Sequence, residues 1–397
     1  MTDTVDAPTR TAAVIGGSLG GLTAANLMRD DGWDVQVFER SPVRLDGRGA
    51  GIVVHPTTVQ YLLDRLELTL DEISCSSSTI RHLGTDGSII HEGPSTYRFT
   101  AWNTLYQALL APMGDRYLLD HTVERVDLDG DRSKVVLTNG TTESFDLVVA
   151  ADGFDSTVRK QFFGDVAPSY SGYVGWRGLV AESELSAETF ELLADSITYC
   201  VLPGSHIVVY PIPTVEGEVA VGDRLINYVW YRNVSEGDEL DRTMTDKDGN
   251  RRAVSMHPGA GDPDVIAEMR EAAKELAPQL TEVIEKTAEP FIQVIVDIES
   301  TSMVSGNVAL MGDGAFSARP HAAAGTAKAA DDAWRLSEAV AGADHVPSAL
   351  AAWERTQLEV GRKLVARARD IGERSQVHDT WVPGDPELAF GLHGPGY

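Results

Sequence analysis

At the start of the chain, the spacing of apolar positions changes from the pattern of a strand to that of a helix and back to that of a strand. An apolar run over Thr11–Ile15 enters a glycine-rich stretch, and a helical spacing that includes Leu22, Ala25 and Met28 leaves it. A second strand-like run follows over residues 34–39. This order predicts a strand, a tight turn, a helix and a second strand, which form the first half of a dinucleotide-binding unit.

The turn has the spacing Gly16-x-Ser18-x-x-Gly21, with serine where a middle glycine is usual. A diphosphate can approach the backbone only where Cβ atoms are missing, and the following helix then directs free N–H groups at the anion. At the end of the second strand, Glu39 can accept hydrogen bonds from a ribose. An ordinary strand-to-helix turn is the alternative. The residues assigned to this nucleotide site are Gly16, Ser18, Leu19, Gly21, Glu39 and Arg40.

Two later apolar runs also end in an acidic residue beside glycine. Residues 145–151 lead into Asp152-Gly153, and residues 308–311 lead into Gly312-Asp313. Continuous apolar runs are typical of buried parallel strands, and ligands bind at the carboxyl ends of such strands. We expect Asp152 and Asp313 to bind the cofactor, with Pro320 and the helix start at Gly325. The alternatives are helix capping by Asp155 or Ser156 and an alanine-rich helix entry.

The middle of the chain is rich in aromatic residues with strand-like spacing. Such segments occupy residues 173–178, 206–213 and 225–231, and a helix is predicted over 264–285. We interpret this region as a mostly β insertion. Its aromatic side chains serve either sheet packing or a wall for a flat substrate, and Tyr210 and Trp230 are the substrate candidates. A long helix with apolar positions from Leu350 to Ile371 follows near the C-terminus.

Composition narrows the class of protein. Of 397 residues, 33 are basic and 60 are acidic, which gives a formal net charge of −27. That charge argues against nucleic acid or an anionic membrane as a partner. The only cysteines are Cys75 and Cys200, without metal-ligand spacing, so neither a disulfide framework nor a metal site is expected. No apolar run has membrane-spanning length, and we expect a cytoplasmic protein.

These motifs together resemble the single-component FAD-dependent aromatic hydroxylases, the group related to para-hydroxybenzoate hydroxylase. The runs at 172–178, 210–213, 319–325 and 388–392 are similar to the dihydroxypyridine hydroxylases of that group. The chain departs from the broad family pattern at Trp102, Phe316 and Ala327, besides Ser18. The resemblance covers nearly the whole chain.

The resemblance implies an α/β fold, in which a Rossmann-type FAD-binding domain carries an inserted, mostly β substrate domain and a long C-terminal helix. The FAD-binding domain would comprise 1–76, 97–168 and 290–397, and the substrate domain 77–96 and 169–289. Asp313 would bind the ribityl chain of FAD, and Gly325 would lie near the flavin pyrimidine. The Asp152-Gly153 motif would serve both FAD and NADPH.

The implied reaction is hydroxylation of an electron-rich, hydroxylated aromatic ring, of the 2,6-dihydroxypyridine type or a phenol. NADPH or NADH reduces FAD, and O2 then forms a flavin C4a-hydroperoxide that attacks the ring. His55 and His321 are the candidate catalytic and substrate-binding residues, because histidine titrates near working pH. A flavin dehydrogenase or oxidase and a non-catalytic flavin-binding protein are the alternatives, and a homodimer is left open.

Overall fold

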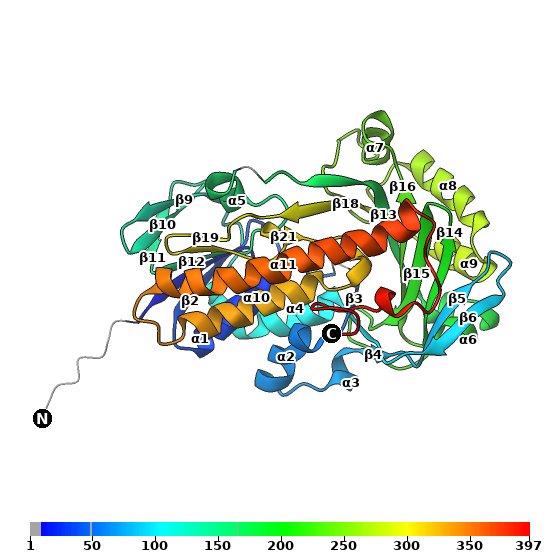
Figure 1. Cartoon of the computed structure of the whole chain (residues 1–397), viewed down its shortest axis with the longest axis horizontal. Coiled ribbons are helices and arrows are strands. Elements are labelled where there is room, and N and C mark those ends of the chain that lie inside the picture. The colour runs from blue at the N-terminus through cyan, green and yellow to red at the C-terminus, as the bar shows by residue number, and fades with distance from the viewer. Residues whose placement is uncertain (1–8, 48–49, 165) are drawn as a thin grey trace, which may run out of the picture.

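The computed structural model describes residues 9–47, 50–164 and 166–397, and Figure 1 shows two main sheets bridged by long helices. The expected first domain includes residues 1–8, which lie outside these ranges.

The first main sheet has six strands in the order β19-β20-β12-β1-β2-β8. Strand β1 lies between β12 and β2 and runs parallel to both, as the sequence predicts. Since β20 is also parallel to β12, all three predicted ligand-binding turns leave the same edge of this sheet. The strands are β1 (Thr11–Ile15), β2 (Asp34–Phe38), β8 (Tyr117–Leu118), β12 (Leu147–Ala150), β19 (Val304–Ser305) and β20 (Val308–Leu310).

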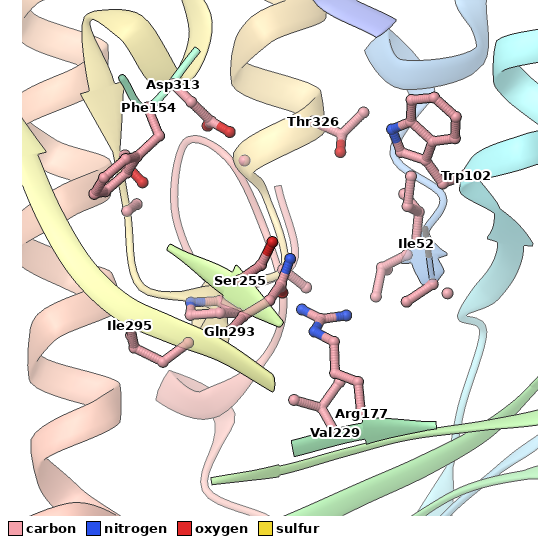
Figure 2. Close-up of a pocket in the computed structure, with 18 of the residues that line it drawn as sticks. Ile52, Trp102, Phe154, Arg177, Val229, Ser255, Gln293, Ile295, Asp313 and Thr326 are labelled. Atoms are coloured by element: carbon pink, nitrogen blue, oxygen red, sulfur yellow. The ribbon is translucent and has the colours of Figure 1, made fainter. Parts of the chain in front are cut away.

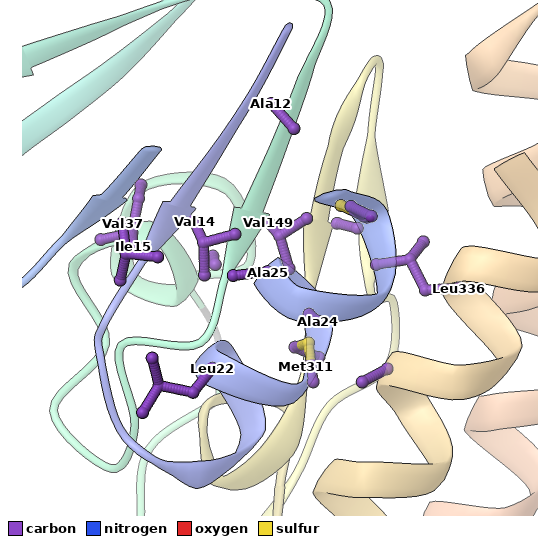
Figure 3. Close-up of a cluster of buried hydrophobic side chains, with 14 of the residues drawn as sticks. Ala12, Val14, Ile15, Leu22, Ala24, Ala25, Val37, Val149, Met311 and Leu336 are labelled. Carbon is purple, nitrogen blue, oxygen red and sulfur yellow. The ribbon is translucent and has the colours of Figure 1, made fainter. Parts of the chain in front are cut away.

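Helices α1 (Leu19–Asp30) and α10 (Gly325–Val340) pack against each other over this sheet. Figure 3 shows Ala25 of α1 beside Val14 and Val149 of the strands, with Leu336 reaching from α10 toward the other side of α1. These side chains are fully buried. Continuous burial explains why the strands have no polar alternation. Helices α2 (Pro56–Arg65), α3 (Leu70–Ile73) and α4 (Trp102–Leu110) belong to the same half of the molecule.

A three-stranded antiparallel meander precedes β12. It consists of β9 (Val123–Asp129), β10 (Arg132–Leu137) and β11 (Thr142–Phe145), and α5 (Thr157–Phe162) packs on β9. A second small sheet has the order β3-β7-β4, with β3 at Gly51–Val53, β7 at Arg98–Ala101 and β4 at Cys75–Ser76.

The second main sheet has nine strands, and its long path runs β17-β18-β13-β16-β15-β14-β5-β6, with β21 beside β18. The hairpin of β5 and β6 joins it although residues 97–168 separate this hairpin from β13. The strands are β5 (Thr79–Leu83), β6 (Ile89–Pro94), β13 (Ser169–Ala181), β14 (Ser196–Leu202), β15 (Ser205–Ile212), β16 (Leu225–Asn233), β17 (Ser255–Met256), β18 (Phe291–Glu299) and β21 (Phe316–Ser317).

Two features of this region differ from the sequence prediction. Strand β18 extends the second sheet beyond the expected boundary at 289/290 as far as Glu299. The helix expected over 264–285 is divided into α8 (Pro263–Ala272) and α9 (Pro278–Lys286). Pro278 lacks an N–H donor and disfavours helical backbone at the preceding residue, so the first helix ends and the second begins at this point. Two short helices, α6 (Ala187–Leu193) and α7 (Asp238–Thr243), complete the region.

The predicted long helix is α11, at Val346–Gln376. It packs on α10 at one end and reaches β15, β16 and β18 at the other, so it connects the two halves (Figure 1). Both cysteines are buried and free. None of the helices in the described part of the chain combines the length and apolarity that crossing a membrane requires.

Candidate active site

One cavity of about 1080 Å³ collects the three predicted turns and a face of the second sheet (Figure 2). The first turn contributes Ser18–Gly21, the second contributes Gly153 and Phe154, and the third contributes Gly312 and Asp313. The sheet contributes side chains from β13, β14, β15, β16 and β18. This volume is slightly above the range of about 300–1,000 Å³ that is common for small-molecule sites, so it can accept a ring as well as part of a dinucleotide.

The first turn needs its glycines for backbone contact. Gly16 has a φ of +101°, and a Cβ on Gly21 would lie 2.0 Å from the carbonyl oxygen of Gly16. Gly17 is equally constrained, because its Cβ would lie 2.3 Å from the ring of Tyr117. Ser18 is the N-cap of α1 but makes no side-chain capping bond, so its hydroxyl is available to a ligand in the cavity.

Glu39 is buried and fixes this turn to β2. Its carboxylate accepts hydrogen bonds of 2.9 Å from the backbone N–H groups of Gly17 and Ser41. A carboxylate has about four acceptor positions, so the side chain retains capacity for a ribose hydroxyl. Neither Glu39 nor Arg40 is among the residues that line the cavity, and Arg40 is exposed.

Arg159 ties the second and third turns together. Its buried guanidinium donates to the carbonyl oxygens of Phe154, at 2.6 Å, and Gly314, at 2.9 Å. Ser156 caps α5 by accepting from the N–H of Arg159, which confirms the capping alternative for that serine. Asp152 accepts from Val158 through Oδ2, while its buried Oδ1 has no hydrogen-bond partner among the described residues. Burial raises the pKa of Asp152.

Asp313 points into the cavity at the end of β20. Its side chain is exposed and lines the cavity, and the surrounding walls raise the pKa of its carboxyl by desolvation. The neighbouring Gly312 N–H donates to Asp332 over 3.0 Å, and Asp332 forms a buried ion pair with Lys328. This pair fixes the turn that presents Asp313.

Pro320 and Gly325 both line the cavity where α10 begins. The N-cap of α10 makes no side-chain hydrogen bond, so its first N–H groups remain available to a ligand. The preceding Ala323 is left-handed, with a φ of 52°. His55 Nε2 lies 2.9 Å from the carbonyl oxygen of Ala323, and the His55 side chain does not line the cavity. His55 therefore lies behind the turn, outside the residues that line the cavity.

Strand alternation decides which aromatic residues reach the cavity. Tyr210 and Tyr231 line it, whereas Trp230, next to Tyr231, faces the opposite side of the sheet. Trp230 packs there in the core with helix α8 and donates from its indole N–H to Ser205 over 2.9 Å. The assignment of Trp230 to the substrate is therefore not supported by its position. Period-two spacing along β15 from Tyr210 would have identified His206, which the sequence reasoning missed.

His206 and His321 face each other in an aromatic cluster, with ring centroids 5.2 Å apart and Tyr231 4.5 Å from His321. Nε2 of His321 lies 2.8 Å from the hydroxyl of Tyr173, and its buried Nδ1 has no hydrogen-bond partner within the described ranges. Burial lowers the pKa of His206 to about 3 and that of His321 well below its ordinary value. Both rings are therefore neutral at pH 7 and can orient a ligand by hydrogen bonds.

The geometry fits the FAD that the sequence resemblance implies. The first turn is a cradle that Cβ atoms would fill, Asp152 keeps an unpaired buried oxygen, and Asp313 directs a carboxylate into the cavity. Glycine turns and helix starts suit phosphates, and carboxylates suit the hydroxyls of a sugar-alcohol chain. These groups extend along one wall, and the sheet face with His206 forms another.

Known proteins were compared with this chain. A family model described as FAD binding domain-like matches residues 170–297. A 2,6-dihydroxypyridine 3-monooxygenase from Paenarthrobacter nicotinovorans is 37% identical over 382 residues, which cover 96% of this chain and 95% of that protein. A 6-hydroxynicotinate 3-monooxygenase from Pseudomonas fluorescens is 25% identical and covers 96% of this chain and 94% of that protein.

Solved structures of similar proteins have the same fold as this chain. The structure of 2,6-dihydroxypyridine-3-hydroxylase from Arthrobacter nicotinovorans matches with a TM-score of 0.93 at 36% identity, and covers 98% of both chains. Klebsiella pneumoniae HpxO complexed with FAD and uric acid has the same fold, with a TM-score of 0.77 at 23% identity over 96% of this chain and 90% of that chain. The chain therefore belongs to the FAD-dependent aromatic monooxygenases, enzymes that hydroxylate aromatic substrates with FAD, NAD(P)H and O2.

Proposed function

We propose that this enzyme hydroxylates a dihydroxylated pyridine, with 2,6-dihydroxypyridine as the first candidate. One observation supports this most: a single cavity joins the nucleotide-binding turns to a sheet face that carries tyrosines and the neutral His206, with the neutral His321 opposite it on the turn before α10. Neutral imidazoles and phenols can match the alternating donors and acceptors of a hydroxylated N-heteroaromatic ring. The relative of 37% identity is named for the same ring.

The cofactor would lie along the three turns. Gly16, Ser18, Leu19 and Gly21 would hold the diphosphate at the start of α1, with Glu39 near the ribose. Arg40 is exposed outside the cavity, so any contact that it makes would be with the outer edge of the nucleotide.

The other two turns would hold the flavin half of FAD. Asp313 would bind the ribityl hydroxyls, Pro320 and Gly325 would border the ring, and Asp152 would support the turn at Gly153. FAD, when bound, supplies electron transfer from NAD(P)H and the activation of O2. The chain's own task is to position the ring and exclude water from it.

Within the substrate pocket, His321 and His206 would hydrogen-bond the ring while Tyr210 shapes its floor. The hydroxyl of Tyr210 donates to the carbonyl oxygen of Gly51 over 3.1 Å, which leaves the face of the phenol ring toward the cavity. Trp381 and Phe390 of the C-terminal segment close the same space. His55 would act as a positioning residue, because it supports the left-handed turn at Ala323.

The test begins with the purified protein and its visible spectrum, followed by a screen of hydroxylated pyridines and phenols for stimulated NADH and NADPH oxidation. Incorporation of one ¹⁸O atom from ¹⁸O2 into the product is expected. An unchanged substrate mass with reduction of O2 would identify an oxidase, and a lack of stimulation by every ring would identify a flavin-binding protein without this activity. Either outcome would reject the proposal.

Variants of His321 and His55 are expected to differ in their effects. His321→Ala should raise KM or uncouple NAD(P)H oxidation from hydroxylation by about 10-fold or more, in line with loss of a hydrogen bond from a buried partner. His55→Ala should act more weakly and through flavin retention. Trp230→Phe, on the opposite face, is the matched aromatic control. Full coupled turnover in both histidine variants would remove both residues from the mechanism.

A further inference from the structure

Arg177 is a cation in the cavity that has no anionic partner in the described part of the chain. It lies on β13, lines the cavity, and has a buried Nε with no hydrogen-bond partner among the described residues. Figure 2 shows its guanidinium rising from β13 toward the middle of the cavity, near Gln293. No ion pair within the described ranges includes Arg177. Arg177 is half-buried as a residue, but its Nε is fully buried, and a guanidinium at such a depth normally has a charged or polar partner, so its position points to an anionic ligand.

Other buried arginines in this chain show the contrast. Arg224 pairs with Glu182 at 2.7 Å, and Arg319 pairs with Asp297 at 3.1 Å. Arg159 donates to two backbone carbonyl oxygens. Each of these guanidiniums stabilises the fold through contacts within the chain. Arg177 has none of these functions and is directed into the space where a ligand binds.

The register of the sheet places Arg177 in the substrate half of the cavity. It is opposite Val229 of β16, and Val229 is opposite Val208 of β15. Tyr231 and Tyr210 flank this row on the same face. Burial raises the pKa of Tyr210 to about 12, and the charge of Arg177 works against that rise, as it does for Tyr231. The positive charge of Arg177 is therefore close enough to act on the tyrosines of this pocket.

The two histidines beside the substrate half are poorly suited to deprotonate a ring. His206 and His321 have pKa values far below that of free imidazole because they are buried, which makes them weak bases. The other acidic and basic side chains along the walls are Asp313 at the end of β20, Glu289 before β18 and His257 after β17. A cation can replace a base if it stabilises the anion, since the proton then leaves to bulk solvent.

We propose that Arg177 is the counter-ion of the substrate, so that the hydroxylated ring binds as its mono-anion with the guanidinium donating to the anionic oxygen. The inference rests on the proposed function and names the ionisation state that the site selects. On binding, one ring O–H or N–H bond is lost, its electron pair stays on the ring, and one proton passes to the solvent. An anionic ring is richer in electrons, as hydroxylation requires.

An opposite charge within about 4–6 Å lowers the pKa of an acid by about 1–3 units. The test uses the oxidised holoenzyme without NAD(P)H, so that no turnover occurs, and 2,6-dihydroxypyridine as the probe. The ultraviolet spectrum of the bound ring is recorded against pH for the wild type, Arg177→Met, Arg177→Lys and Arg232→Met. Arg232 is the matched control, since it lies on the same sheet and stacks over Trp230 on the other face at 4.9 Å.

The ring bound to the wild type should ionise about 1–3 pH units below the free ring. Arg177→Met should lose that shift, Arg177→Lys should keep part of it, and Arg232→Met should match the wild type. Calorimetry in two buffers of different ionisation enthalpy should show about one proton released per ring bound below the free pKa, and none for Arg177→Met.

Equal ionisation in the wild type and Arg177→Met, or binding of the neutral ring, would overturn the inference. If the screen selects another ring, the same titration is made with that ring. Absence of hydroxylation of any ring would mean failure of the proposed function, whereas a bound and hydroxylated ring without the shift would reject only the role of Arg177.

Discussion

The two ends of the cavity are built in different ways. The end that we propose for the cofactor consists of turns at the ends of β1, β12 and β20, with glycines, free backbone N–H groups and the carboxylate of Asp313. The substrate end consists of side chains on a sheet face, among them Arg177, His206 and Tyr231. Backbone turns recognise what all dinucleotides share, whereas side chains can change one at a time without disturbing the turns. The comparison indicates why one cofactor site can serve many rings.

The largest effect is expected when the backbone turn itself is filled. Gly21→Ala would place a Cβ 2.0 Å from the carbonyl oxygen of Gly16, a contact that no side-chain rotation can relieve. We expect flavin affinity to fall by about 100-fold or more, or the protein to be purified without flavin. Gly93→Ala is the control, since its Cβ would meet Ile80 at an ordinary 3.6 Å. A yellow, fully loaded Gly21→Ala protein would contradict this account of the turn.

Asp313→Asn tests whether the carboxylate of the third turn binds FAD. The change keeps the shape but removes a charged acceptor, and a hydrogen bond to a charged group contributes about 1.5–3 kcal/mol. Flavin affinity should therefore fall by about 10- to 150-fold, measured by titrating the apoprotein with FAD. Tyr210→Phe, at the substrate end, should leave that affinity unchanged. Equal losses in both variants would mean that the two ends do not act separately.

Gly372→Ala should affect the substrate end alone. A Cβ at this position of α11 would lie 2.5 Å from Cδ2 of His321 and 2.6 Å from the hydroxyl of Tyr173. Helix propensity favours alanine by about 0.5–1 kcal/mol, so a net loss would report the clash, which we expect to cost about 1–3 kcal/mol. Substrate KM should rise while flavin content stays constant. Gly394→Ala, whose Cβ would meet nothing within 4 Å, is the control.

Acid stability is expected to depend on the buried His206. Because burial lowers the pKa of His206 to about 3, the unfolded chain binds a proton between about pH 6.5 and 3 that the folded chain does not. This histidine therefore removes about 1.4 kcal/mol of stability per pH unit as the pH falls through that window. His206→Gln should make the free energy of unfolding less dependent on pH between 5 and 6.5, as measured in denaturant. The exposed His393→Gln should not; equal pH slopes for wild type and His206→Gln would be inconsistent with a buried neutral imidazole.

The cofactor end could be predicted from the sequence because its signals are local. The run from Thr11 to Ile15, the glycines after it and the acid at position 39 all lie within one βαβ unit, and the structure confirms that fold. Glycine spacing reports backbone geometry directly. Even here the contact between Gly17 and Tyr117 was not predictable, since it joins residues far apart in the chain.

The substrate end could be predicted only in part because its geometry depends on register. Trp230 and Tyr231 are neighbours in sequence but face opposite sides of the sheet. To tell which of the two faces the cavity, one must know the register of the strand, because a shift by one residue exchanges the two faces. The sequence also gives no sign that the ring of His55 lies 2.9 Å from the carbonyl oxygen of Ala323, in a left-handed turn far along the chain. The unpaired state of Arg177 is a property of its three-dimensional surroundings, for which the sequence offers no signal.

The helix α11 limits how this enzyme can open. It contains 31 residues, so it spans about 46 Å, and it is fastened to α10 at one end and to strands of the second sheet at the other. A hinge between the two halves would have to bend or detach this continuous rod. Exchange of rings and release of product must therefore depend on smaller displacements of the cavity walls, with the two halves moving as one body.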